Sequence, residues 1–252
     1  MFPLRDDNPT LRTPIITWAI IAVTFATWIL VQGAGTEPRL AASICSLGLI
    51  PGELLHRLAL GIEVPMGDGI SCRIGAANWL TPLTSMFMHG GWGHVIGNMW
   101  FLHVFGNNVE DSMGRGRYLA FYLLVGLAAA AAQVLVDPSS PIPMVGASGA
   151  VSGVMGAYVV LYPRVGVQVW LPPFFRLVLP AWAMVGVWFV LDNLLPASLL
   201  LGIDRQGGVA FWAHIGGFLA GIFLVLPFRD PDLVAEHRRR ARDWRDRGVP
   251  VG

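Results

Sequence analysis

Long apolar segments alternate with short polar connections along this chain, in a pattern typical of a protein that crosses a membrane several times. Crossing a hydrocarbon core of about 30 Å takes roughly 20 helical residues. Apolar segments of about this length cover residues 15–31, 118–136, 144–162, 177–195 and 209–227. A sixth segment, residues 94–108, carries histidines and asparagines but is otherwise apolar, so we count it as a span. The pattern predicts an all-α membrane protein with a bundle of six transmembrane helices.

Composition and charge agree with a membrane protein and indicate its orientation. Hydrophobic residues make up 54% of the chain and charged residues 13%, and the mean hydropathy is +0.59, which excludes an ordinary soluble domain. With a cytoplasmic N-terminus, thirteen of the 17 basic residues fall in cytoplasmic segments, as the positive-inside rule requires, and all are arginine. We expect both termini in the cytoplasm and a bacterial inner membrane as the location, because the N-terminal segment lacks the features of a transit peptide.

The predicted spans divide the chain into three parts. Residues 1–13 form a cytoplasmic N-terminal segment, residues 14–228 form the six-helix domain, and residues 229–252 form an arginine-rich cytoplasmic tail. We expect the tail to be solvated and weakly attracted to anionic lipid. No second folded domain fits in the remaining short connections.

One connection is long, from residue 32 to about residue 93, and lies outside in the predicted topology. It is rich in glycine and proline but also in apolar residues, so we expect it to rest in the membrane interface, with an amphipathic helix over residues 53–60. Both cysteines, Cys45 and Cys72, lie in this connection. An oxidising compartment would permit a disulfide there, and two buried free thiols fit the sequence equally well.

Unusual polar residues occur in the first turns of three spans that enter the membrane from the outside: His94 and Asn98, Ser148, and His214. At a helical rise of 1.5 Å per residue, they lie about 3 to 9 Å below the outer interface. A serine flanked by small residues and an intramembrane histidine suggest a nucleophile and its general base. The Asn98 amide and the Ser148 backbone N–H would supply donors for an oxyanion.

The position of Ser148 adds to this hypothesis. Pro141 and Pro143 delay the start of the fourth predicted span to about Gly146, which leaves Ser148 at the positive end of the helix dipole. The dipole would favour a negative charge developing at this point.

Each of these residues has a purely structural explanation as well. Serine among glycines commonly marks a close helix contact, and Gly217 and Gly221 form a G-x-x-x-G motif on the sixth span. Asn98 could link helices through its amide, and His214 could make a structural hydrogen bond. Close helix approach is needed for either explanation, since it would bring His214 to about 2.6 to 3.2 Å from the Ser148 hydroxyl.

The motifs around these residues resemble the three signatures of the rhomboid family of intramembrane serine proteases, in order and on the expected spans. They are His89-Gly90-Gly91-Trp92-Gly93-His94-Val95-Ile96-Gly97-Asn98, Gly146-Ala147-Ser148-Gly149, and Ala213-His214-Ile215-Gly216-Gly217 with Gly221.

The resemblance covers about residues 14–228 and implies specific roles. Ser148 is then the nucleophile and His214 the general base, without an acidic third member. Asn98, His94 and the Ser148 N–H stabilise the oxyanion, and Gly146 and Gly149 support the serine motif. The family also implies that the first outside connection and movement around the fifth span govern substrate entry.

One position departs from the family pattern. Many members carry an aromatic residue four positions after the nucleophile, where it packs against the catalytic histidine, and this chain has Ser152. Asp192 and Asn193 are candidates for orienting His214 instead, although Asp192 is better explained by pairing at the membrane interface or with Arg205. His89 and His103 have no assigned role, and His103 is expected on the face opposite His94.

The sequence therefore predicts an intramembrane serine endopeptidase that cleaves transmembrane segments of membrane-protein substrates near their outer end. The expected partners are these substrates and membrane lipid, with no nucleic acid, metal or cofactor; the H-E-x-x-H motif of a zinc protease is missing. The alternatives are a catalytically inactive rhomboid-like protein that binds membrane helices, and a small transporter or channel. Polar residues gathered at one depth argue against a conduit, which should show them through the whole membrane.

Overall fold

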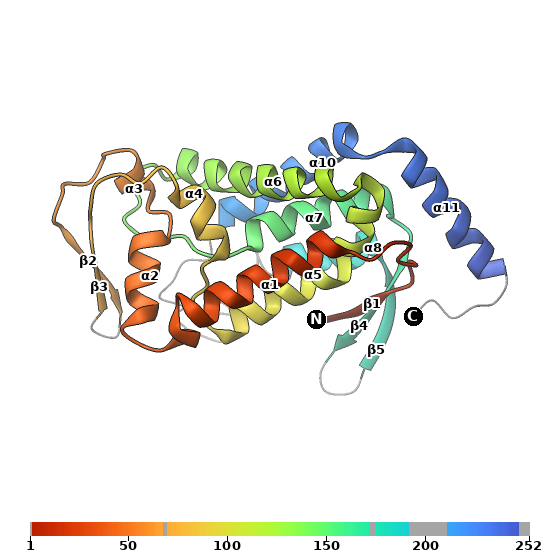
Figure 1. The fold of residues 1–252 in the computed structure, drawn as a ribbon, viewed down its shortest axis with the longest axis horizontal. Helices are drawn as coiled ribbons and strands as arrows, with labels where there is room; N and C mark the ends of the chain where they lie inside the picture. Colours follow the sequence, from red (N-terminus) through yellow and green to blue (C-terminus); the bar gives the residue numbers. More distant parts are fainter. Residues whose placement is uncertain (1, 68–69, 172–174, 192–210, 247–252) are drawn as a thin grey trace.

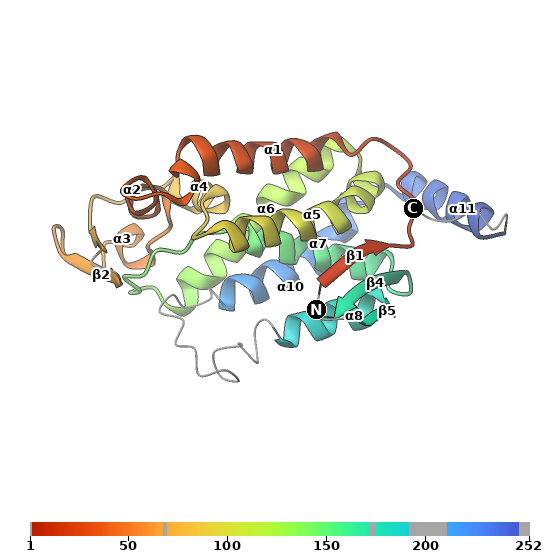
Figure 2. The ribbon, with the colours of Figure 1, turned by 90° about the horizontal axis from the view of Figure 1, so that it is seen from below.

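The computed structural model describes residues 2–67, 70–171, 175–191 and 211–246. It is mostly helical, and the helices of its bundle lie along its long axis (Figures 1 and 2). These are α1 (Ile15–Leu30), α5 (Trp92–Met113), α6 (Arg115–Val136), α7 (Ser148–Leu161) and α10 (Phe211–Phe228). Helix α7 is buried over most of its length, because its many glycines and alanines let the neighbouring helices approach.

Helix α1 exposes large apolar side chains. Its buried residues are Thr17, Ile20, Thr24 and Trp28, whereas Trp18 and Val23 are 50% and 52% exposed. Large apolar side chains on the outer face of a helix suit contact with lipid.

Two of the described helices, α6 and α10, are long and apolar enough to cross a membrane. Helices α1 and α7 are apolar but have only 16 and 14 residues. Helix α5 has 22 residues and carries Glu110 and Asp111 in its last turn.

The predicted span over residues 177–195 is wrong at its start. Residues 177–180 belong to strand β5 (Phe175–Pro180), which pairs with β4 (Gly166–Leu171), and helix α8 (Ala181–Phe189) begins only after Pro180. A short apolar run fits a strand as well as a helix, so the hydrophobic pattern alone did not separate them. Residues 192–195 lie outside the described part of the chain.

The end of the bundle that holds residues 31–91 is called the loop end. This connection folds into short elements: η1 (Gly33–Gly35), α2 (Arg39–Leu47), α3 (Pro51–Leu54), β2 (Glu63–Gly67), β3 (Ile70–Arg73), α4 (Thr81–Thr84) and η2 (Ser85–Phe87). Cys45 of α2 and Cys72 of β3 form a disulfide, with their Cα atoms 5.3 Å apart. The disulfide links α2 to the β2–β3 hairpin.

The predicted amphipathic helix over residues 53–60 is also wrong, because α3 ends at Leu54. The backbone N–H of Arg57 donates to the carbonyl of Gly52 at 2.7 Å, and His56 adopts a positive φ of 54°. This turn closes the helix in the manner of a Schellman motif.

The opposite end of the bundle, the sheet end, contains a three-stranded antiparallel sheet in the order β1-β4-β5, with β1 covering Phe2–Asp6. The N-terminal segment is therefore a folded edge of the sheet. Asp6 accepts hydrogen bonds from the Tyr158 hydroxyl and from Asn108 Nδ2. These bonds tie the N-terminal segment to α7 and α5.

The described part of the tail is mostly exposed, in line with a solvated tail, but it is an ordered helix that also contacts the bundle. Residues Pro231–Asp246 form helix α11, in which Val234 and His237 are buried. The His237 ring lies 3.1 Å from Asn108 Oδ1 and stacks near Tyr162. Burial lowers the pKa of His237 to about 4, so the ring is neutral at physiological pH.

Helix α1 starts against a buried carboxylate from α5. Glu110 accepts hydrogen bonds from the backbone N–H groups of Ile16 and Thr17, at 3.0 and 2.8 Å, and from the Thr17 hydroxyl at 2.8 Å. These N–H groups have no partner within α1, and the negative charge also suits the positive helix end.

We expect Glu110→Ala to lower the free energy of unfolding by about 2–3 kcal/mol, because it leaves buried donors unsatisfied. Glu236→Ala is the control, since Glu236 only pairs with the exposed Arg12 and Arg240; its cost should stay below about 1 kcal/mol. Denaturant titration in detergent micelles measures both. Equal losses would show that Glu110 contributes no more than a surface charge.

Candidate active site

Ser148 and His214 meet at the start of two adjacent helices. Ser148 is the first residue of α7, and His214 lies in the first turn of α10. His214 Nε2 is 2.7 Å from Ser148 Oγ, and His214 is only 5% exposed. With the proton on Nδ1, Nε2 accepts the hydroxyl hydrogen, which is the arrangement of a nucleophile and its base.

The turn before Ser148 fixes where α7 begins. Gly146 has a φ of +128°, and its N–H donates to the Ser85 carbonyl at 2.9 Å. The prediction that the helix starts close to Gly146, with Ser148 at its positive end, is confirmed. A Cβ on Gly146 would lie 2.7 Å from His94 Nε2, so the His94 ring packs directly on this glycine.

The separation of Ser148 and His214 depends on backbone contact between α7 and α10. A Cβ on Gly217 would lie 2.0 Å from the Gly149 carbonyl oxygen, and one on Gly221 would lie 2.0 Å from the Gly153 carbonyl oxygen. No side chain fits in either place. The close helix packing expected from these glycines is present, and it is what brings the imidazole to the hydroxyl.

Asn98 and His94 lie on the helix beside this pair. Asn98 is 8% exposed, and its buried Nδ2 has no hydrogen-bond partner among the described residues. His94 Nδ1 accepts the Gly90 N–H at 3.5 Å. A buried amide donor without a hydrogen-bond partner is costly, so Asn98 Nδ2 is a group that an entering acceptor could satisfy.

His89 positions the turn that carries Ser148, a role that the sequence did not assign. Its backbone N–H donates to Gln32 Oε1, and its carbonyl accepts from Gln32 Nε2, both at 2.8 Å. Burial, and then the neighbouring His94, lower the pKa of His89 to about 3, so the ring is neutral. Its Nε2 can therefore accept the Ala147 N–H, at 3.4 Å. The only sequence signal for this role was the place of His89 as the first residue of the motif that contains His94 and Asn98.

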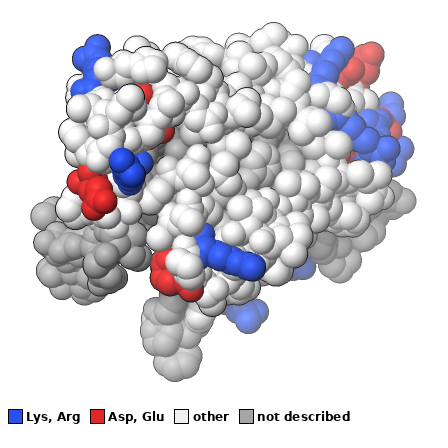
Figure 3. Space-filling model, turned by 60° about the vertical axis from the view of Figure 1, so that its left-hand side comes forward, with Lys and Arg blue, Asp and Glu red and all other residues white. Residues whose placement is uncertain are grey.

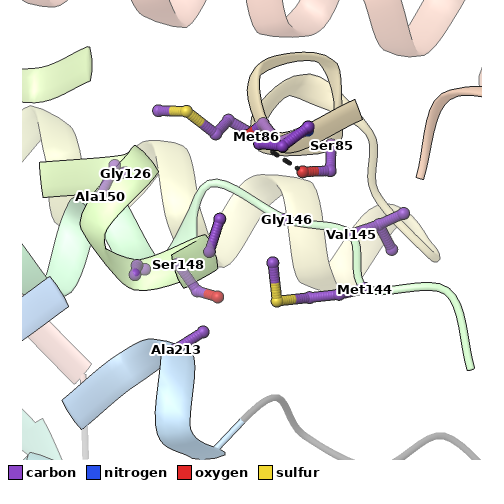
Figure 4. A pocket seen from close by; sticks show the side chains of 13 residues that line it. Ser85, Met86, Gly126, Met144, Val145, Gly146, Ser148, Ala150 and Ala213 are labelled. Carbon is purple, nitrogen blue, oxygen red and sulfur yellow. Dashed lines mark hydrogen bonds between the residues drawn. The ribbon is translucent and has the colours of Figure 1, made fainter. Parts of the chain in front are cut away.

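A small cavity opens beside Ser148, with Met86, Met144 and Ala213 on its walls (Figure 4). Its volume is about 20 Å³, enough for one water molecule. The cavity is lined mainly by apolar and small side chains. Its position offers a space for water or a small side chain next to the nucleophile.

Four other residues that the sequence singled out have no established place in this site. Ser152 is fully buried, and its hydroxyl has no hydrogen-bond partner among the described residues. Asp192 and Asn193, considered for orienting His214, lie outside the described residues. His103 is exposed on α5, with its ring near Trp100 and away from the Ser148 pair. Across the described ranges, no three His, Cys, Asp or Glu side chains are grouped to hold a metal ion.

Comparison with known proteins gives the class to which this fold and site belong. The Rhomboid domain matches residues 76–230, a segment that includes Asn98, Ser148 and His214. The chain belongs to the rhomboid family of membrane-embedded proteins.

Similar proteins come from plants, bacteria and animals. RHOMBOID-like protein 5 of Arabidopsis thaliana is 29% identical over 244 residues, covering 86% of this chain and 69% of that protein. Rhomboid protease GluP of Bacillus subtilis is 31% identical over 162 residues, covering 64% of this chain and 28% of that protein. The human presenilin-associated rhomboid-like protein, mitochondrial, is 27% identical over 151 residues, covering 57% of this chain and 36% of that protein. The chain thus spans a minor part of some relatives and over two thirds of another.

We expect Gly217→Ala to separate α7 from α10, because its methyl group would overlap the Gly149 carbonyl. The predicted loss of stability is about 1–3 kcal/mol, the usual cost of overpacking, as measured by thermal or denaturant unfolding in detergent. Gly186→Ala in α8 is the control, since a Cβ there meets nothing within 4 Å. This control should be neutral or slightly stabilising. A neutral Gly217→Ala would contradict the backbone contact.

Proposed function

We propose that this protein is an intramembrane serine endopeptidase that cleaves transmembrane segments of other membrane proteins near their outer end. The observation that carries the proposal is the 2.7 Å contact between His214 Nε2 and Ser148 Oγ. The unpartnered donor of Asn98 supports it. The relative from Bacillus subtilis is named a rhomboid protease, which adds support by analogy.

The reaction follows from the roles of these groups. Ser148 Oγ attacks the substrate carbonyl carbon while His214 Nε2 takes the hydroxyl proton. The negative charge that forms on the carbonyl oxygen is stabilised by the Ser148 backbone N–H and by Asn98 Nδ2, with His94 nearby. His214 then gives the proton to the leaving amine, and the peptide bond breaks to leave an acyl-enzyme. Water attacks the ester with His214 again as base, which releases the acid product and restores Ser148.

The first donor of the proposed oxyanion hole is a backbone group, not a side chain. Because Ser148 is the first residue of α7, its N–H has no carbonyl partner within the helix and is available at the positive helix end. A substrate helix must unwind locally to expose its amide to this group. Small or helix-breaking residues near the cleaved bond are therefore expected.

The proposal includes a six-span topology with the loop end on the outside. The exposed apolar side chains of α1 support membrane contact, and the face in Figure 3 is mostly uncharged, with charged side chains gathered in a few clusters. The arginines Arg5, Arg12, Arg115, Arg117 and Arg229 belong to the sheet end or its adjoining turns, as expected for a cytoplasmic side. The Cys45–Cys72 disulfide at the loop end suits an oxidising compartment, such as the outside of a bacterial inner membrane.

Covalent labelling by a fluorophosphonate probe tests the activated serine. We expect the purified wild type to be labelled, and Ser148→Ala and His214→Ala to lose labelling while remaining folded, because one removes the nucleophile and the other its base. Ser152→Ala is the matched control on the same helix. It removes a buried hydroxyl without a partner, so labelling should persist. A folded wild type without any labelling would favour the inactive, helix-binding alternative. Cleavage of a transmembrane substrate that persists in Ser148→Ala would refute the mechanism.

The contribution of Asn98 can be separated from its effect on stability. Asn98→Ala should slow labelling about 10²- to 10³-fold, because it removes an oxyanion donor. Its free energy of unfolding should change by less than about 1 kcal/mol, since the deleted Nδ2 has no partner to lose. Asn107→Ala, nine residues along the same helix and bonded to Thr10, is the control and should label at the wild-type rate. Normal labelling in Asn98→Ala would exclude Asn98 from the oxyanion hole.

A further inference from the structure

A polar groove lies at the sheet end, far along α5 from the Ser148 pair. It has a volume of about 530 Å³ and separates the N-terminal segment from α1 and α5. Its lining includes Arg5, Arg12, Trp18, His103 and Asn107. All but Asn107 are exposed, so the groove opens to the surroundings of the bundle.

The depth of the groove matches the headgroup region of a membrane. Trp18 is in the first turn of α1, about 5 Å along the axis from Ile15, and Asn107 lies about 9 Å before the end of α5 at Met113. Trp18 and Asn107 therefore lie near the same end of the bundle. The helices that carry them belong to a family of membrane-embedded proteins. Exposed tryptophans are enriched at the headgroup level of a bilayer, where the amphipathic ring contacts both apolar and polar surroundings.

The charges of the groove favour an anion. Arg5 makes no ion pair with any described residue. Arg12 forms an ion pair with the half-buried Glu236 at 3.0 Å and also lies within electrostatic range of Asp111. The one acidic residue of the lining, Asp6, already accepts hydrogen bonds from Tyr158 and Asn108. Burial raises the pKa of Asp6 to about 7, so its negative charge is partly neutralised at physiological pH. Asp6 therefore opposes an anion only weakly.

We propose that this groove binds an anionic phospholipid, with the headgroup phosphate between the guanidinium groups of Arg5 and Arg12 and the glycerol and upper acyl region against Trp18. Guanidinium groups present fixed pairs of donors that match phosphate oxygens. Asn107 and Thr10, which are hydrogen-bonded to each other at 2.6 Å, form the neutral polar wall beside the phosphate. A lipid fits better than free phosphate because the groove lies between lipid-facing helices and includes an apolar ring. The site is independent of the chemistry proposed for Ser148.

Competition between two lipids tests the site. The full chain is purified in detergent, mixed with equal amounts of phosphatidylglycerol and phosphatidylcholine, and examined by native mass spectrometry. We expect the wild type to retain phosphatidylglycerol about tenfold over phosphatidylcholine, and Arg5→Gln to lower this preference several-fold. Arg5→Gln leaves the Arg12–Glu236 ion pair intact, so the contact with α11 is preserved. Arg12→Gln should act in the same direction.

Arg176→Gln is the matched control, because Arg176 is an exposed arginine of the same sheet that does not line the groove. It removes the same charge and should keep the wild-type preference. Equal loss in Arg176→Gln and Arg5→Gln would overturn the proposal in favour of diffuse charge attraction, as would a wild type without preference. Displacement of the lipid by inorganic phosphate at about 10 mM would also overturn the proposal, because a site that holds the acyl region of a lipid should resist free phosphate. Thermal unfolding of each variant confirms that the fold is retained.

Discussion

Backbone contact between α7 and α10 is the constraint on which the rest of the structure depends. The Gly149 and Gly153 carbonyls occupy the space where side chains of Gly217 and Gly221 would be. Because these are main-chain atoms, they cannot yield in the way that a flexible side chain can. The short distance between Ser148 and His214 is therefore set by the helices themselves. The serine motif can therefore serve close helix packing and the proposed catalysis at once, because both need the same contact between α7 and α10.

Sequence patterns predicted the parts of the fold that depend on local information. The helices over residues 15–30 and 115–136 follow from continuous apolar segments, and the start of α7 follows from Pro141 and Pro143. The pattern failed where distant segments decide the conformation. Residues 177–180 became a strand because β4 offers them a partner, and β4 in turn pairs with β1.

The candidate site shows the same division. Ser148, His214 and Asn98 could be selected because their residue types are unusual in apolar segments, and their common depth follows from helical rise. The role of His89 could not be selected in this way. It depends on a pair of hydrogen bonds with Gln32, 57 residues earlier, and on the N–H of Ala147, 58 residues later. Such contacts appear only once the loop end has folded against the helices.

The pairing of β1 with β4 also constrains how the chain can be threaded through a bilayer. Asp7 and Gln168, which are hydrogen-bonded beside these strands, are 161 residues apart. Strand β1 is synthesised long before β4, so the two strands can pair only after the helices between them have been made. The two strands can meet only if an even number of membrane crossings separates them. In the proposed six-span topology, α1, α5, α6 and α7 supply that even number (Figure 1). Under that topology, a chain that failed to insert one of these helices would leave β1 and β4 on opposite sides of the membrane, so sheet formation would act as a check on insertion.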